Sequence, residues 1–122
     1  MNIVLLEPEM PSNTGNIGRT CVATDTTLHL IEPLGFTLNE KKIKRAGLDY
    51  WDKLKLYRYS DFEDFLEKNP RAKTRLYMAT TKAEKTYSEV SYEEDDYIMF
   101  GKESAGIPEE ILIRDKESCI RI

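Results

Sequence analysis

The sequence predicts a single α/β domain with a mainly parallel sheet flanked by helices. Short apolar runs typical of buried strands alternate with segments of helical spacing, which is the pattern of strand–helix–strand units. The 122 residues suffice for one compact domain and are too few for two ordinary ones. Because no repeat, low-complexity segment or linker divides the chain, we treat residues 1–122 as one domain.

The first unit lies at the N-terminus. "NIVLL" (2–6) and "TLHLIE" (27–32) are predicted as buried strands. Between them, "NTGNIGRTCVATD" is predicted as a helix that begins at Asn13, a residue type that caps helices. Three residues of this segment can share its apolar face: Ile17, Cys21 and Thr24.

The remaining elements repeat the alternation. Four further strands are predicted over 53–59, 75–80, 96–101 and 118–122. Ser60 precedes Glu63 at the spacing of a capping box, and an apolar stripe follows on Phe62, Phe65 and Leu66. "PEEIL" (108–112) predicts a short helix with proline in its first turn.

Composition limits the classes of function. The net charge of −4 and the pI of about 5.1 argue against a protein that binds polyanions over its whole surface. Cys21, Cys119 and the single histidine, His29, fit no zinc spacing. Lone thiols without a signal peptide favour a reducing cytoplasm, and no apolar run approaches the roughly 20 residues of a membrane span.

In a parallel sheet, ligands bind at the carboxyl ends of strands, so the informative loops follow residues 6, 32, 80, 101 and 122. The first loop reads "EPEMPSNTGNIGRT" (7–20). Free amides at the predicted helix start, near Asn13, Thr14 and Gly15, would favour an anion such as a nucleic-acid phosphate. Arg19 lies one turn further and suits phosphate or a ribose hydroxyl. The alternative is a plain helix cap followed by a solvated arginine.

Three other segments could contact ligands. "NEKKIKRAG" (39–47) carries four cations that either contact phosphates or form a solvated helix face: Lys41, Lys42, Lys44 and Arg45. In "GKESAGIP" (101–108), Gly101 and Gly106 would allow a flat ligand to approach the main chain, with Glu103 at the loop's centre. "ATTKAEKT" (79–86) follows a neighbouring strand. Ordinary turns are the alternative for both loops.

Three aromatic residues are expected to be structural. His29 lies inside a predicted strand and is expected to pack in the core rather than to catalyse. Tyr50 and Trp51 could stack on a base, but packing under a loop is the favoured interpretation.

Taken together, "NIVLLEPEMPSNTGNIGRTC", "LHLIEPLGF", "KRAGLDYW" and "YIMFGKESAGIP" resemble the SPOUT superfamily of knotted RNA methyltransferases. Within it, the chain is similar to the small tRNA (cytidine/uridine-34)-2′-O-methyltransferases, over nearly all residues and in the same order. The resemblance implies an α/β fold whose C-terminal part threads through a loop as a trefoil knot. It also implies methylation of the wobble ribose in the anticodon stem-loop of a cytoplasmic tRNA.

The resemblance further implies a set of site residues. S-adenosylmethionine would be held largely by backbone groups, at Ala79, Thr80, Gly101 and Ile122. The family works as a homodimer in which an arginine, here Arg19, reaches toward the donor bound by the other subunit. Asn13 and Asn16 flank it and would contact RNA, as would the basic run 41–45. Glu103 matches the acidic residue of a second motif and joins Arg19 as an expected catalytic residue. No metal is implied.

The implied chemistry is an in-line methyl transfer to a 2′-oxygen, helped by positioning of the two reactants. Because an arginine is essentially always protonated in proteins, we expect Arg19 to orient the hydroxyl and to stabilise developing negative charge. The proton would then leave through phosphate or water.

The sequence departs from the family after "CIRI" (119–122). Family members continue with a proline-containing segment, a serine/asparagine motif and a final helix that complete the pocket, the knot and the dimer. We expect these residues to be part of a longer chain; a truncated form would bind the donor poorly and be inactive. A non-catalytic RNA-binding module and a flavodoxin-like mononucleotide binder, which would be yellow, are the alternatives from other classes.

Overall fold

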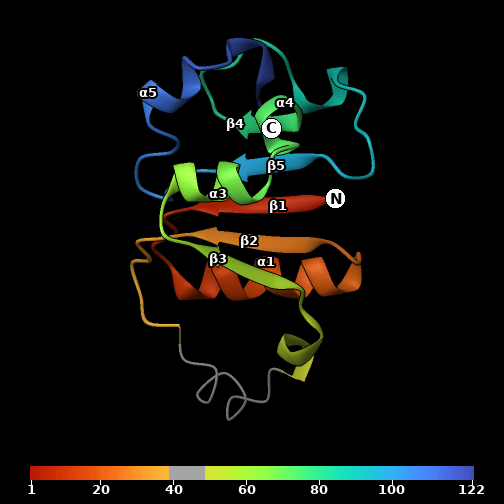
Figure 1. Cartoon of the computed structure of the whole chain (residues 1–122), viewed down its shortest axis with the longest axis vertical. Helices are drawn as coiled ribbons and strands as arrows, with labels where there is room; N and C mark the ends of the chain where they lie inside the picture. The colour runs from red at the N-terminus through yellow and green to blue at the C-terminus, as the bar shows by residue number, and fades with distance from the viewer. Residues whose placement is uncertain (39–48) are drawn as a thin grey trace.

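The computed structural model describes residues 1–38 and 49–122. Six strands form one sheet in the order β3-β2-β1-β5-β4-β6, and all strand pairs in it are parallel (Figure 1). The strands are β1 (Asn2–Leu6), β2 (Thr27–Ile31), β3 (Leu56–Tyr59), β4 (Leu76–Ala79), β5 (Tyr97–Phe100) and β6 (Cys119–Ile120). The predicted α/β class and parallel sheet are confirmed.

Helices connect these strands. The α-helices of the described residues are α1 (Pro11–Ala23), α3 (Phe62–Lys68), α4 (Ala72–Arg75) and α5 (Glu109–Leu112). The 3₁₀ helices are η1 (Asp49–Lys53), η2 (Tyr87–Glu89) and η3 (Lys116–Ser118). Strands β3 and β6 are shorter than predicted: η1 precedes β3, η3 precedes β6, and β6 ends at Ile120.

The predicted helix starts are wrong in three places. Helix α1 begins two residues before Asn13, at Pro11, whose fixed φ suits a first helical position. The N-cap of α3 is Asp61, whose carboxylate accepts from the Asp64 amide at 2.7 Å; Ser60 lies outside the helix. Pro108 is the N-cap of α5 and precedes its first turn. Thr24, predicted on the apolar face of α1, is its exposed C-cap.

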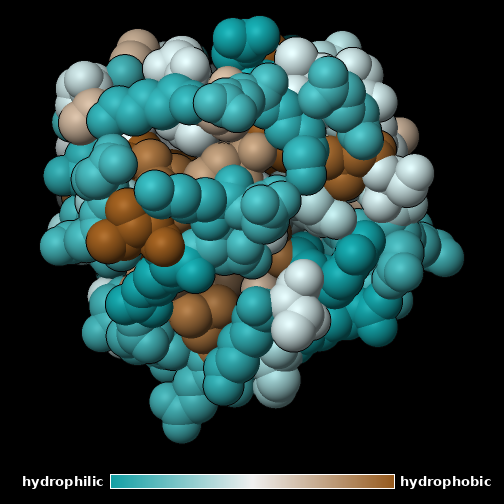
Figure 2. Space-filling view, turned by 90° about the horizontal axis from the view of Figure 1, so that it is seen from above, coloured by the Kyte–Doolittle hydropathy of each residue, from teal (hydrophilic) through white to brown (hydrophobic). Residues whose placement is uncertain are grey.

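Alternation along the strands divides the core between the two faces of the sheet. On β1, Val4 and Leu6 belong to the cluster with Phe65 of α3 and Ile111 of α5, whereas Leu5 packs with Cys21 of α1. Helix α1 therefore covers one face, and α3, α4 and α5 cover the other. Seen from the end that carries α5 and the C-terminus, the surface shows apolar side chains in separate patches among hydrophilic ones (Figure 2).

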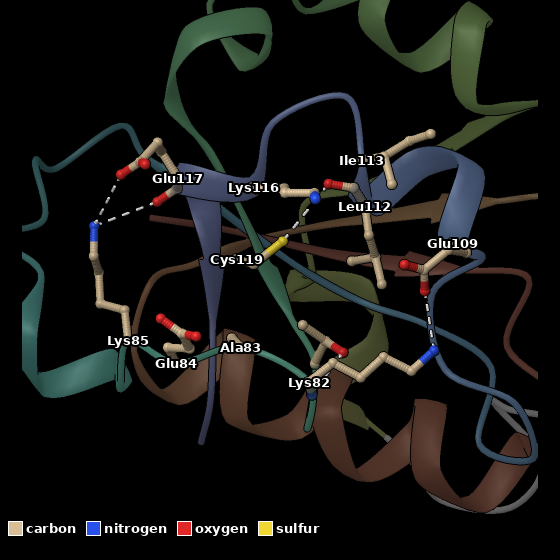
Figure 3. Close-up of a pocket in the computed structure, with 11 residues that line it drawn as sticks. Lys82, Ala83, Glu84, Lys85, Glu109, Leu112, Ile113, Lys116, Glu117 and Cys119 are labelled. Carbon is tan, nitrogen blue, oxygen red and sulfur yellow. Dashed lines mark hydrogen bonds and ion pairs between the residues drawn. The ribbon is translucent and has the colours of Figure 1, made fainter.

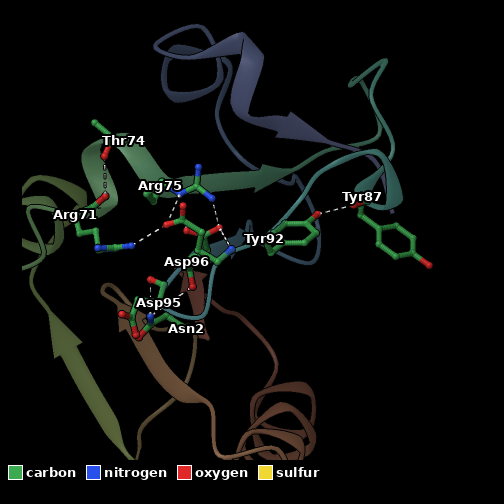
Figure 4. A network of polar contacts seen from close by, with 9 residues as sticks. Asn2, Arg71, Thr74, Arg75, Tyr87, Tyr92, Asp95 and Asp96 are labelled. Carbon is green, nitrogen blue, oxygen red and sulfur yellow. Dashed lines mark hydrogen bonds and ion pairs between the residues drawn. The ribbon is translucent and has the colours of Figure 1, made fainter.

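An ion pair fixes the edge of the sheet at which β5 begins. Arg75, at the end of α4, donates from Nε to Asp96 Oδ1 at 2.6 Å and from a second nitrogen to Asp96 Oδ2 (Figure 4). Burial alone would raise the pKa of the Asp96 carboxyl, but hydrogen bonds from Arg75 and the Glu93 amide bring it below its usual value. The side-chain amide of Asn2 also reaches this turn, where Nδ2 donates to the Asp95 carbonyl at 3.2 Å.

His29 lies in a buried polar chain that defines its protonation. The Asn2 side-chain nitrogen donates to backbone carbonyls, so Asn2 Oδ1 accepts from His29 Nε2 at 2.9 Å. His29 Nδ1 then accepts from the Tyr59 hydroxyl at 2.8 Å, and that oxygen accepts from Asn69 at 3.1 Å. The ring is therefore neutral. It is also buried, as predicted from its place in a strand.

Stability should fall in mild acid because of His29. Burial lowers its pKa from 6.5 to about 4. In the unfolded chain the His29 imidazole is protonated below pH 6.5, whereas in the folded chain it stays neutral down to about pH 4. The free energy of unfolding therefore declines between these two pH values. Between pH 7 and 5 we expect a loss of about 2 kcal/mol relative to a His29→Gln variant, measured by urea unfolding. Parallel pH profiles of the two proteins would contradict this role.

Candidate functional site

A cavity of about 400 Å³ opens at the carboxyl edge of the sheet, between the loops that follow β4 and β5. Three predicted cofactor residues, Ala79, Thr80 and Ile122, line it, together with Glu103. Gly101 lies between two further lining residues, Phe100 and Lys102. The chain fold therefore brings these predicted residues together, as the parallel topology requires.

The loop after β5 is a tight backbone turn. The Gly106 amide donates to the Lys102 carbonyl at 2.8 Å, and Gly106 has a φ of +72°. A Cβ at Gly101 would collide with the backbone of Gly106 and Ile107. The two glycines serve different needs, since Gly101 provides room and Gly106 provides a left-handed conformation.

Strand β6 is held from both sides at the cavity. On one side, the Thr80 amide donates to the Ile120 carbonyl at 2.8 Å. On the other side, the backbone amide of Arg121 donates to the Lys85 carbonyl at 2.8 Å. The Arg121 carbonyl accepts from the backbone amide of Tyr87 at 2.9 Å. The end of β6 thus lies between β4 and the segment 85–87, which are joined by the loop 80–84.

Two glutamates join the loops after β1 and β5. The Glu103 carboxylate accepts from the amides of Glu9 at 2.8 Å and Met10 at 3.3 Å. In return, Glu9 Oε1 accepts from the Ser104 amide at 2.9 Å and from its hydroxyl at 2.6 Å. We call these three residues, Glu9, Glu103 and Ser104, the glutamate clasp.

The clasp lowers the pKa of both carboxylates. Ser104 lowers the pKa of Glu9, through its hydroxyl first and its amide second. Burial alone would raise the pKa of Glu103, but hydrogen bonds from the Glu9 and Met10 amides and the Asn13 side chain bring it below its usual value. A carboxylate whose oxygens accept from the chain in this way positions loops. It is poorly suited to accept a substrate proton.

The predicted RNA-contacting residues lie on α1. Arg19 and Asn16 are exposed, Asn13 is half-buried, and none of the three lines the cavity. The guanidinium carbon of Arg19 lies 5.3 Å from the centroid of the Tyr50 ring. Trp51 is buried, so the expected packing of this aromatic is confirmed. The predicted basic run, 41–45, lies outside the described residues.

Sequence reasoning missed Glu9 and the contact of Tyr50 with Arg19. The clasp joins residues 95 positions apart, and nothing in "EPEMPSN" indicates which loop Glu9 meets. The only available signal was positional: both loops follow strands of the same parallel sheet.

A second cavity, of about 430 Å³, lies next to the first and shares Thr80 and Lys82 with it (Figure 3). Ion pairs cross its walls, Lys82 with Glu109 at 3.0 Å and Lys85 with Glu117 at 3.9 Å. Burial raises the pKa of the Cys119 thiol at this cavity, which disfavours the reactive thiolate. No group of three or more potential metal ligands gathers among the residues with described positions.

The two glycines of the β5 loop make a matched test. Gly106→Ala has open space around the new methyl group and should lose about 1–2 kcal/mol of stability, the strain of a left-handed alanine. Gly101→Ala meets backbone atoms and should lose about 3 kcal/mol or more, with faster amide exchange over 101–107. Urea unfolding measures both losses. Equal losses for the two variants would mean that the close backbone approach at Gly101 is not required.

Comparisons with known proteins find similar sequences over nearly the whole chain. The profile of the SpoU rRNA Methylase family matches residues 1–122. The chain is 49% identical over 124 residues to a putative tRNA (cytidine(34)-2′-O)-methyltransferase of Listeria innocua, covering 99% of this chain and 72% of the relative. It is 50% identical over 113 residues to the tRNA (cytidine(34)-2′-O)-methyltransferase of Escherichia coli K12. This match covers 92% of this chain and 70% of that relative.

Solved structures show the same fold. One, described as "Structural insights into the 2-OH methylation of C/U34 on tRNA", superposes with a TM-score of 0.89 at 44% identity, covering 99% of this chain and 78% of that one. The fold is also shared by the SpoU methyltransferase AviRb of Streptomyces viridochromogenes in complex with AdoMet. The two superpose with a TM-score of 0.79 at 15% identity, covering all of this chain and 48% of that one.

No helix in the described ranges is long and apolar enough to cross a membrane. The flavodoxin-like alternative is wrong, because a methylase profile matches from the first residue to the last and the structural neighbours are methyltransferases. The predicted resemblance is confirmed, and the chain belongs to the SpoU family of RNA methylases.

Proposed function

We propose that this protein transfers a methyl group from S-adenosylmethionine to the ribose 2′-hydroxyl of nucleotide 34 in tRNA, where the base is cytidine or a 5-modified uridine. The proposal rests mainly on sequence identity. About half of the aligned residues are identical in each of two relatives that are named for this reaction at cytidine 34. The cavity at the carboxyl edge gives the reaction a place in the fold.

The cavity suits the donor by its chemistry. Its walls combine apolar side chains, among them Phe100, Ile107 and Ile122, with the backbone turn of 102–106, against which a flat base can lie. When bound, S-adenosylmethionine supplies an electrophilic methyl group on a sulfonium. Ala79, Thr80, Gly101 and Ile122 hold it in the proposed complex, and no metal takes part.

Arg19 is the proposed catalytic residue on the RNA side. Its planar fork orients the 2′-hydroxyl and the neighbouring phosphate and stabilises negative charge as the proton leaves. Asn13 and Asn16 contact the backbone of the anticodon stem-loop, and Lys41, Lys42, Lys44 and Arg45 extend the contact. Glu103, through the glutamate clasp, positions the loop after β5 instead of reacting itself.

The proposed active unit is a cytoplasmic homodimer. Arg19 is absent from the cavity lining of its own chain, which supports action on the donor held by the partner. We also propose that the C-terminal part forms a trefoil knot. The backbone hydrogen bonds that hold β6 between β4 and the segment 85–87 support this.

Replacing Arg19 should strongly slow methyl transfer without unfolding the protein. We expect Arg19→Ala to lower kcat by about 100-fold or more, the effect of removing one charge-stabilising donor. The assay measures labelled methyl transfer from S-adenosylmethionine to tRNA in the full-length protein. Arg71→Ala is the control, since Arg71 pairs with Glu93 near the opposite edge of the sheet.

Two results would contradict the proposed reaction. Equal labelling of a tRNA whose ribose 34 already carries a 2′-O-methyl group would exclude that position. An absence of label in any tRNA would favour the alternative of a non-catalytic RNA-binding module.

Mixed dimers test action across the subunit interface. Arg19→Ala keeps its own cavity intact, and Ile122→Glu places a charge in the cavity while keeping Arg19. If Arg19 acts in the partner's site, an equal mixture should recover about one quarter of parental activity, because half of the dimers are hybrids with one intact site each. Each variant alone should be inactive in either case. A mixture that stays inactive would be the result expected for action within one subunit, and would contradict action across the interface.

A further inference from the structure

The side chain of Arg19 rests on an aromatic ring from a distant part of the chain. Its guanidinium carbon lies 5.3 Å from the ring centroid of Tyr50, which belongs to η1. A guanidinium within about 6 Å of an aromatic face is attracted by the ring's negative potential. The contact restricts a long side chain that would otherwise sample many rotamers.

The Tyr50 ring is itself fixed. Its hydroxyl donates to the Gly15 carbonyl at 2.8 Å, one helical turn before Arg19. Its ring packs edge-to-face against Trp51, with centroids 6.3 Å apart and planes at 67°. Trp51 is only 7% exposed, so the platform beneath the arginine is anchored in the protein interior.

Glycines on α1 allow this approach. Gly15, Gly18 and Arg19 follow the spacing i, i+3, i+4 and therefore share one face of the helix. A Cβ at Gly18 would lie 3.4 Å from Trp51 and 3.3 Å from Leu54, tighter than most such contacts. The absence of a side chain at Gly18 lets Trp51 and Leu54 pack closely against α1, and the Tyr50 ring lies beside Arg19.

We propose that Tyr50 is a positioning residue for Arg19. The ring holds the guanidinium in one orientation on the surface of α1, so its fork is ordered before the RNA ribose arrives and less freedom is lost on binding. This inference rests on the catalytic role proposed for Arg19, and it assigns to Tyr50 no direct contact with donor or RNA.

The kinetic test compares two substitutions in the full-length protein. Tyr50→Leu removes the ring and should lower kcat for tRNA methylation about two- to fivefold, the factor expected for an exposed cation–π contact. The affinity for S-adenosylmethionine should not change. Tyr50→Phe keeps the ring and should retain most of the activity. Tyr57→Leu, at an exposed tyrosine on β3, is the matched control and should behave as the parent.

A spectroscopic test reads the contact without any reaction. In the free protein, the side-chain protons of Arg19 should show upfield ring-current shifts in NMR spectra. These shifts should persist in Tyr50→Phe and vanish in Tyr50→Leu. If Tyr50 only stabilised the fold, the Arg19 signals would change only together with the thermal unfolding midpoint. A change in these signals at an unchanged midpoint therefore reports the contact itself.

The two readouts separate the inference from the proposed function. If the parent protein methylates tRNA and Tyr50→Leu matches its kcat, the positioning role is overturned. Unshifted Arg19 signals in the parent would overturn it as well. If the parent does not methylate tRNA at all, the proposed function fails, while the NMR comparison still decides whether Tyr50 orders Arg19.

Discussion

The parallel pairing of β1 with β5 is the constraint on which the rest of the site depends. Leu5 and Phe100 are register partners, so the chains that leave these strands emerge side by side at the same edge. The glutamate clasp can form only because of this register, since its members lie about 95 residues apart. The clasp in turn holds Glu9 and Met10, immediately before α1, and α1 carries Arg19. One strand pairing therefore links the cavity to the face proposed to contact RNA.

The clasp also decides which part of α1 is open to an anion. From the sequence, free amides near the helix start would favour an anion such as a phosphate, with a plain helix cap as the alternative. In the structure, the Glu103 carboxylate already accepts from the amides of Glu9 and Met10, immediately before α1. A second negative group beside that carboxylate would be repelled. The proposed contact of Arg19 with an RNA phosphate, one turn along the helix, avoids this repulsion.

Much of the fold was predictable, because strand patterns and helical stripes depend on neighbours in sequence. β1 was predicted at its full length, and the six strands all follow predicted apolar runs. The helix starts were wrong where two signals competed: Pro11 outweighed Asn13, and Asp61 outweighed Ser60. The cavity followed from parallel topology, but the partner of Glu9 and the platform under Arg19 did not. Those contacts depend on the packing of loops and of η1, for which the sequence holds no local pattern.

The central position of β5 has a consequence for synthesis of the chain. In the sheet order, β5 lies between β1 and β4, yet it is made after both. One edge of β1, an apolar strand, therefore stays without its hydrogen-bonding partner until residue 100 has emerged from the ribosome. At 5–20 residues per second, this interval lasts roughly 5 to 20 s. An open apolar edge is a template for pairing with other chains. The nascent protein is thus most prone to aggregation before β5 inserts, and factors that shield the N-terminal strand during translation should raise its yield.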